Sequence, residues 1–332
     1  MKKRIKDIFK LAIFLSLGIF IVWYLLKDPQ QRALILKNTK EVMLGYRWVY
    51  LVICMFIGFL SVVLRGLRSV LMIEPLGYKI SKINSYHAVM IGYFANFLFP
   101  RLGEVLRCSV LQKQEKVPFQ KSFGTVITER VIDMLLFGVL FLIALVLESE
   151  KLLPYIKENV SFSGTGKYIL LGGMVGITVL VYVFRKKINS LSIYQKAVKI
   201  GKEFWAGLIS IKDLKKPFRF VLYSLLIWVC YYFMFYIATF AFPDLAVLGT
   251  KGVLLASLSC LVIGTIGFAT PIPGGIGVYS FLVYKALSLY EIPEGLGMTV
   301  GFDIWAAETL MYLALGLTSV LMLLYKKEKT KA

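Results

Sequence analysis

The stretch ANFLFPRLGEVLR, residues 95–107, ends an apolar segment with a proline, a glycine and three charged side chains. A helix that simply crosses a bilayer needs about 20 mainly apolar residues and has no use for such an interruption. Proline cannot continue a helix, and irregular backbone at membrane depth must face protein or water. The stretch therefore predicts a re-entrant hairpin over residues 86–112, whose turn faces a cavity, or lies at the interface if the segment spans fully.

The rest of the chain is typical of an integral membrane protein. Of its 332 residues, 58% are hydrophobic and 17% are charged, whereas soluble domains are about half apolar and about a quarter charged. The apolar residues gather in blocks that are each near or above the length of a spanning helix. We expect an all-α polytopic helical bundle of about eight spans plus the hairpin. The blocks are Ile8–Leu26, Trp48–Leu64, Val131–Leu147, Tyr168–Phe184, Phe218–Phe240, Gly252–Thr270 and Thr299–Tyr325.

The net charge of +20 is distributed as membrane topology requires, which argues against a nucleic-acid partner. With a cytoplasmic N-terminus and a hairpin that returns to its own side, most of the 39 Lys and Arg residues fall in cytoplasmic segments. The first block is longer than a signal-peptide core and lacks a cleavage site. We expect one domain over residues 1–332, with both termini cytoplasmic, in a bacterial-type inner membrane. The basic loop 185–219 either lies on anionic lipid head groups or only sets topology.

A second interruption, FATPIPGGIGVYSF at residues 268–281, predicts another broken segment over 268–289. Paired Pro/Gly interruptions in two halves, here 1–147 and 218–325, point to a substrate site between inverted repeats. Each break exposes helix-terminal N–H groups that favour an anionic ligand such as a lipid phosphate. The alternative is two tight turns in which glycine is needed for conformation alone.

Charged side chains adjoin the first break and the start of the following span. We expect a cross-pairing in which Arg101 or Arg107 meets Glu129 or Asp133, with one guanidinium left for a phosphate. A purely structural ion-pair network is an equal alternative. The remaining members of this charged set are Glu104, one helical turn from either arginine, and Arg130.

Other polar residues carry weaker signals. Arg65 and Arg68 are expected to anchor the end of a span at the interface. Glu308 lies deep in the last apolar block, so it is a proton-coupling candidate together with Glu104 and Asp133, unless a neighbouring hydroxyl simply holds it protonated. The single histidine and the four cysteines have no metal-ligand spacing, so we expect no metal site and no catalytic residues.

Four motifs occur together in this order: VVLRGLRSVLM, GYFANFLFPRLGEVLRCSVL, TERVIDML and TPIPGGIGVYSF. Over essentially its whole length the chain resembles the flippase-like membrane domain of lysylphosphatidylglycerol synthetases, a family with many stand-alone members. The resemblance implies a domain that moves or accommodates lipids. The chain departs from the family's pattern at Tyr279 and Ser280, where the family often has Glu, and at Asp303, where it often has Arg. The positions that match the family's motifs are Asn96, Pro100, Gly103, Glu104, Arg107, Glu129, Arg130, Asp133, Pro273, Gly274, Gly275 and Gly277.

Together these features predict a non-enzymatic lipid translocase that handles a phospholipid or polyprenyl-linked lipid with an anionic head group. No Gly-rich nucleotide-binding motif is present and no cofactor is expected. We also expect no aminoacyl-transfer domain, so that any modification of the lipid is carried out by another protein. The alternative is a membrane scaffold or accessory subunit that binds a lipid-modifying enzyme through the loop 185–219. A membrane-embedded transferase has the least support.

Overall fold

The computed structural model describes residues 29–98, 102–152, 154, 214–270 and 272–329. These residues form helices and turns, and five of the helices are long and apolar enough to cross a membrane. The predicted all-α membrane bundle is therefore confirmed. The blocks Ile8–Leu26 and Tyr168–Phe184 and the loop residues 185–213 lie outside the described residues. The five long helices are α3 (Trp48–Ile73), α6 (Phe119–Leu147), α11 (Pro217–Thr239), α12 (Gly249–Ala269) and α14 (Glu294–Lys329).

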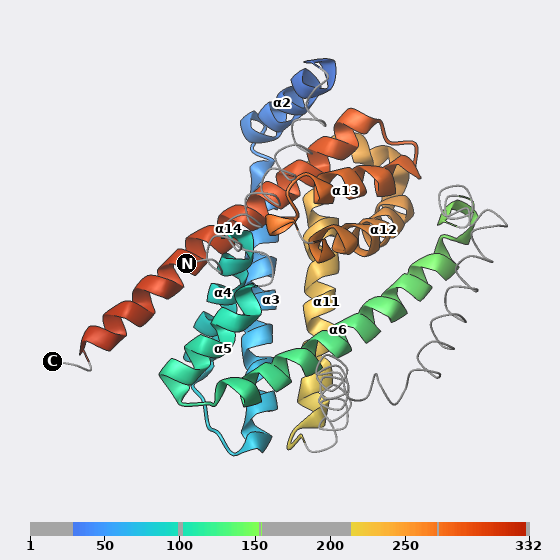
Figure 1. Ribbon diagram of the computed structural model, residues 1–332. Helices are drawn as coiled ribbons and strands as arrows, with labels where there is room; N and C mark the ends of the chain where they lie inside the picture. Colours follow the sequence, from blue (N-terminus) through green and yellow to red (C-terminus); the bar gives the residue numbers. More distant parts are fainter. Residues whose placement is uncertain (1–28, 99–101, 153, 155–213, 271, 330–332) are drawn as a thin grey trace, which may run out of the picture.

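Helices α3 and α11 lie side by side at the centre of the bundle and run in opposite directions (Figure 1). Cys54 of α3 contacts the carbonyl of Met234, whereas Arg68, further along α3, contacts Ser224, which lies earlier in α11. The contact is apolar near Cys54 and polar near Arg68. This antiparallel pair joins the two halves of the chain.

The first broken segment forms a helical hairpin of α4 (Lys82–Leu98) and α5 (Leu102–Glu115). At the open end of the hairpin, the start of α4 contacts the end of α5: the Asn84 side-chain amide donates a hydrogen bond to the Glu115 carboxylate. The two helices pack backbone to backbone near the turn. A Cβ atom on Gly103 would lie only 2.1 Å from the carbonyl oxygen of Gly92, so no larger residue fits. The predicted hairpin is thus present, and its turn residues 99–101 lie outside the described part.

The second broken segment is also a hairpin, formed by α12, the short 3-10 helix η4 (Pro273–Gly275) and α13 (Val278–Ser288). Gly274, Gly275 and Gly277 have φ angles of +57°, +65° and +76°, which L side chains rarely adopt. This explains the glycine-rich sequence of the turn. Near the far end of the hairpin, Ser259 of α12 lies 3.1 Å from the hydroxyl of Tyr290, just after α13.

The two hairpins enter the bundle from opposite ends (Figure 1). Helix α4 of the first hairpin packs on α14, and helix α12 of the second packs on α6, while α5 and α13 pack on the long helix of their own half, α6 and α14 respectively. With α3 and α11 antiparallel, the two halves make corresponding contacts, as in an inverted repeat. Helix α2 (Pro29–Leu44) lies outside this repeat and packs on α14.

Candidate functional site

A buried ion-pair network lies where α3, α6 and α11 meet. The Arg68 guanidinium is fully buried and donates two hydrogen bonds to Asp133, with N···O distances of 2.7 and 3.1 Å. Arg65 donates to the same carboxylate at 2.8 Å and, through Nε, to the hydroxyl of Tyr231 at 2.9 Å. Ser224 of α11 accepts a further hydrogen bond from Arg68. Asp133 is therefore held by two guanidinium groups at once.

The network continues into the first hairpin through Arg107 of α5. Arg107 pairs with Glu129 in a bidentate fork at 2.9 and 2.7 Å, and Glu129 also lies 3.5 Å from Arg68. Nearer the surface, Arg130 pairs with Glu104 at 2.8 Å. The predicted cross-pairing is thus confirmed for Arg107 and Glu129. Helix α5 is tied to α6 and α3 by charge as well as by packing.

One expectation about these charges was wrong. Arg65 and Arg68 do not anchor the end of a span at the interface: both are buried and contact Asp133 inside the bundle. The physical reason is that a buried charge gains most from an opposite charge within the interior. Glu104, which lies one helical turn from Arg107, pairs with Arg130 of α6, whereas Arg107 pairs with Glu129.

The buried part of the network carries an excess positive charge. Among the described residues it contains the three guanidinium groups of Arg65, Arg68 and Arg107 but only the two carboxylates of Glu129 and Asp133. The Nε donors of Arg68 and Arg107 are buried without a hydrogen-bond acceptor in the described part of the chain. A buried charge excess is costly, and a phosphate or carboxylate would relieve it through bidentate hydrogen bonds.

The tips of the two hairpins meet at the middle of the bundle. A Cβ on Gly274 would lie 2.4 Å from the ring of Phe97, near the end of α4, so the two segments are in direct contact. Trp305 of α14 fixes the second tip by donating a hydrogen bond from its indole nitrogen to the Gly274 carbonyl at 2.8 Å. Asn96 fixes the first, because its side-chain oxygen accepts a bond from the Gly103 N–H at 2.7 Å. Aromatic rings surround the contact between the two breaks.

A layer of tyrosines joins this meeting point to the ion-pair network. Tyr312 stacks on Tyr93 with ring centroids 4.8 Å apart, and it also packs on Phe97. The Tyr93 hydroxyl lies 3.4 Å from that of Tyr231, which accepts the hydrogen bond from Arg65. Polar contacts therefore run from Asp133 through Arg65 and Tyr231 to Tyr93 of α4, and ring stacking connects Tyr93 to α14, the helix that holds the second tip.

The family model described as the lysylphosphatidylglycerol synthase TM region matches residues 8–316. The chain belongs to this family. It is also 23% identical over 285 residues to the UPF0104 membrane protein MJ1595 of Methanocaldococcus jannaschii, an alignment that covers 78% of this chain and 80% of that protein. No solved structure matches the chain.

The positions marked by resemblance to the lysylphosphatidylglycerol synthase TM region fall into two groups. The charged ones are members of the ion-pair network or of the Arg130–Glu104 pair beside it. The glycines, with Asn96 and Pro273, shape the two hairpin tips. Pro100 and Arg101 lie outside the described residues. Of the departures from the family, Tyr279 packs against Gly264 and Gly267 of α12, and Asp303 accepts a hydrogen bond from Thr39 of α2.

Sequence reasoning missed the residues that connect these two groups. Tyr93, Tyr231, Trp305 and Tyr312 lie in apolar blocks, where aromatic residues usually serve as core. The sequence did offer one signal for these four residues. Each side chain carries a hydroxyl or indole N–H that must find a hydrogen-bond partner when it is buried in a membrane.

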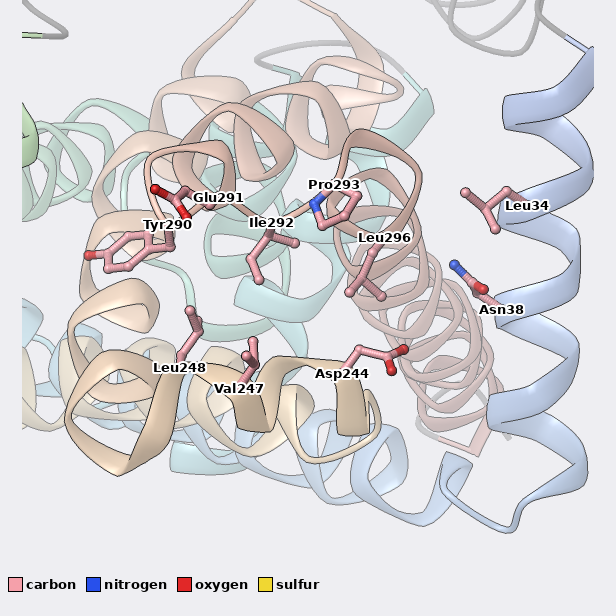
Figure 2. A pocket seen from close by; sticks show the side chains of 10 residues that line it. All are labelled: Leu34, Asn38, Asp244, Val247, Leu248, Tyr290, Glu291, Ile292, Pro293 and Leu296. Atoms are coloured by element: carbon pink, nitrogen blue, oxygen red, sulfur yellow. The ribbon is translucent and has the colours of Figure 1, made fainter.

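A separate cavity of about 510 Å³ opens at the end of the bundle where α2 approaches the turn between α13 and α14 (Figure 2). Asp244, Glu291 and Asn38 contribute its charged and amide groups, and most of the remaining wall is apolar. None of the predicted site residues lines it. Its lining residues are Leu34, Asn38, Asp244, Val247, Leu248, Tyr290, Glu291, Ile292, Pro293 and Leu296.

Proposed function

We propose that this protein is a membrane lipid translocase that handles a phospholipid or polyprenyl-linked lipid with an anionic head group. The observation that carries the proposal is the excess guanidinium charge buried between the two halves, beside two opposed hairpins whose tips touch. Broken helices that meet near mid-membrane at the interface of inverted repeats are the usual setting of transporter binding sites. Family membership supports a role that involves membrane lipid.

In this proposal the head group binds to guanidinium groups while the acyl chains stay in the bilayer. A phosphodiester carries one negative charge and accepts bidentate hydrogen bonds from arginine, so it matches the one-charge excess of the network. Arg107 and Arg65 are the arginines at the edge of the network, with 8% and 7% of their side-chain surface exposed, whereas Arg68 has none. They are therefore the first groups that a head group would contact.

The proposal places the protein in a bacterial-type cytoplasmic membrane and the open end of the α4–α5 hairpin on the cytoplasmic side. Support for this orientation comes from the lysines around that end, which follow the positive-inside rule. We propose further that the protein moves the lipid without modifying it, and that any partner enzyme acts separately. The lysines in question are Lys79, Lys82, Lys113, Lys116, Lys121, Lys215 and Lys216.

Arg65→Gln tests the proposal without leaving a buried acid unpaired. Asp133 keeps both of its hydrogen bonds from Arg68, and the new amide can still contact Tyr231, so the fold should persist. The substitution removes the excess charge of the network. We expect the protein in liposomes to translocate fluorescent phosphatidylglycerol, measured by dithionite quenching, and Arg65→Gln to reduce that rate at least about tenfold, the effect of roughly 1.4 kcal/mol.

The matched control is Arg47→Gln, which removes an exposed arginine from the turn between α2 and α3. It should translocate the probe at the wild-type rate. A wild-type protein that leaves the probe in its original leaflet would refute translocation. An Arg65→Gln variant as fast as wild type would refute the role of the charge excess.

A further inference from the structure

Two arginines of the buried network each keep one side-chain donor without an acceptor in the described part of the chain. Both terminal nitrogens of Arg68 bond to Asp133, and both terminal nitrogens of Arg107 bond to Glu129. In each guanidinium group the carboxylate thus takes the same edge and leaves Nε over. The Arg68 side chain is fully buried and that of Arg107 is 8% exposed, so these two donors are shielded from bulk water.

The two free donors belong to one compact cluster. Glu129 joins them, because its carboxylate lies 2.7 Å from a nitrogen of Arg107 and 3.5 Å from a nitrogen of Arg68. Buried polar groups nearly always have a hydrogen-bond partner, and those that lack one within the protein commonly hold a water molecule or an ion. Two such donors beside one carboxylate therefore indicate a ligand.

The charge of the cluster decides what kind of ligand this is. Arginine stays protonated in proteins, so three guanidinium groups bring three positive charges, and the two carboxylates that they contact bring two negative ones. A net charge in the interior costs free energy unless an opposite charge lies beside it. A water molecule would give Nε an acceptor but would leave the excess charge in place. An anion provides both the acceptor and the charge.

Other acids near the cluster do not restore the balance among the described residues. Glu104 pairs with Arg130 at 2.8 Å, so together they add no net charge. Glu308 lies on α14, one helical turn after Trp305, and in the described part of the chain no hydrogen bond or ion pair joins it to the network. Charge balance within these residues therefore requires a bound anion.

The size of the anion follows from the burial of the arginines. A lipid phosphate, which carries two ester substituents, can contact Arg65 and Arg107 at the edge of the network, but Arg68 has no exposed surface. A monatomic anion needs far less room and accepts hydrogen bonds from several N–H groups at once. It can therefore bind inside the closed network, where a lipid head group cannot.

We propose that the resting protein holds one small monovalent anion, of the size of chloride, against the Nε donors of Arg68 and Arg107, and that the lipid head group displaces it. This inference rests on the proposed function and adds an exchange step to it. A phosphodiester brings one negative charge to Arg107 and Arg65, so two anions held together would reverse the excess charge. One anion leaves as the other binds, and the exchange needs no co-reactant.

Equilibrium dialysis of the full-length protein in detergent against radioactive chloride tests the resting state. We expect about one chloride per wild-type molecule, because the excess is one charge. Arg65→Gln leaves both Nε donors in place but removes the excess charge, so it should lose the bound chloride. Arg107→Lys keeps the charge and loses Nε, so its affinity for chloride should fall at least about tenfold. The matched control, Arg47→Gln, should bind chloride as wild type does.

Competition with lipid tests the displacement. Dihexanoyl phosphatidylglycerol is titrated calorimetrically into wild-type protein in chloride and in gluconate buffers of equal ionic strength. When chloride is present at about ten times its own Kd, the apparent Kd of the lipid should be about tenfold higher than in gluconate. Arg47→Gln should show the same rise. Circular dichroism and size-exclusion chromatography show whether each variant is folded.

The outcomes separate this inference from the function on which it rests. Wild-type protein that binds and translocates the lipid but holds no chloride would overturn the exchange and leave the translocase intact. The same holds if the Kd of the lipid does not depend on chloride, or if folded Arg65→Gln binds chloride as tightly as wild type. Wild-type protein that holds chloride but neither binds nor translocates the lipid would overturn the proposed function and the displacement, and leave only an anion site.

Discussion

A methyl group added at Gly103 measures how closely the two arms of the first hairpin must pack. In Gly103→Ala the new Cβ would lie 2.1 Å from the Gly92 carbonyl oxygen and 2.7 Å from the Asn96 side chain. Carbon and oxygen normally approach to about 3.3 Å, so α4 and α5 must separate by roughly 1 Å. Overpacking of this kind costs about 1–3 kcal/mol, and loss of the bond from the Gly103 N–H to Asn96 adds about 1 kcal/mol.

Alanine's better helix propensity offsets about 0.5–1 kcal/mol of this cost. We therefore expect Gly103→Ala to lower the free energy of unfolding by about 1–3.5 kcal/mol. The assay is SDS titration in mixed micelles, followed by circular dichroism. The matched control is Gly138→Ala in α6, where an added Cβ meets no atom within 4 Å. That variant should be as stable as wild type or more stable by up to about 1 kcal/mol.

The reasoning fails if the two alanine variants unfold at the same SDS fraction. Such a result would mean that the hairpin opens at no cost and that the Gly92–Gly103 contact does not set the position of α5. Arg107 would then owe its position to the bond with Glu129 alone.

Two further variants test the network and the second tip by the same unfolding assay. Asp133→Asn leaves Arg65 and Arg68 buried beside a neutral group, so the free energy of unfolding should fall by about 3–5 kcal/mol. A fall of less than about 1 kcal/mol would show that solvent or another group compensates for the lost carboxylate. Trp305→Phe keeps an aromatic ring but loses the hydrogen bond to the Gly274 carbonyl, so the free energy of unfolding should fall by about 1 kcal/mol. A variant as stable as wild type would show that this hydrogen bond does not hold the tip.

Much of the fold was predictable because the bilayer leaves a chain few choices. Apolar blocks of spanning length can only be helices, and a Pro/Gly interruption between them must turn in a protected place. The first hairpin followed from Pro100 and Gly103, and the second from the Pro273 to Gly277 turn. Which long helices each hairpin packs on was not predictable, since apolar faces carry little information about their partners in lipid.

The charged site was predicted only in part. From sequence, the Arg107–Glu129 pair was one of four possible pairs of Arg101 or Arg107 with Glu129 or Asp133, because opposite charges near a membrane boundary tend to pair. Arg65 and Arg68 looked like interfacial anchors because they end an apolar block. Their true partner, Asp133, became evident only once α3 and α6 were seen to cross. The tyrosines were missed for a similar reason, because their hydroxyl partners lie on other helices.

The inverted arrangement explains how a buried charge excess can persist in a membrane. Removing Arg65 or Arg107 would improve the charge balance of the resting protein, yet each arginine also joins two helices. Arg65 joins α3 to α11 beside the Arg68–Ser224 hydrogen bond, and Arg107 joins α5 to α6 beside the Arg130–Glu104 pair. If the arginines served stability alone, a third carboxylate in the network would stabilise it more. The described network holds no third carboxylate, and this unmatched guanidinium charge is the feature on which the proposed binding of an anionic head group rests.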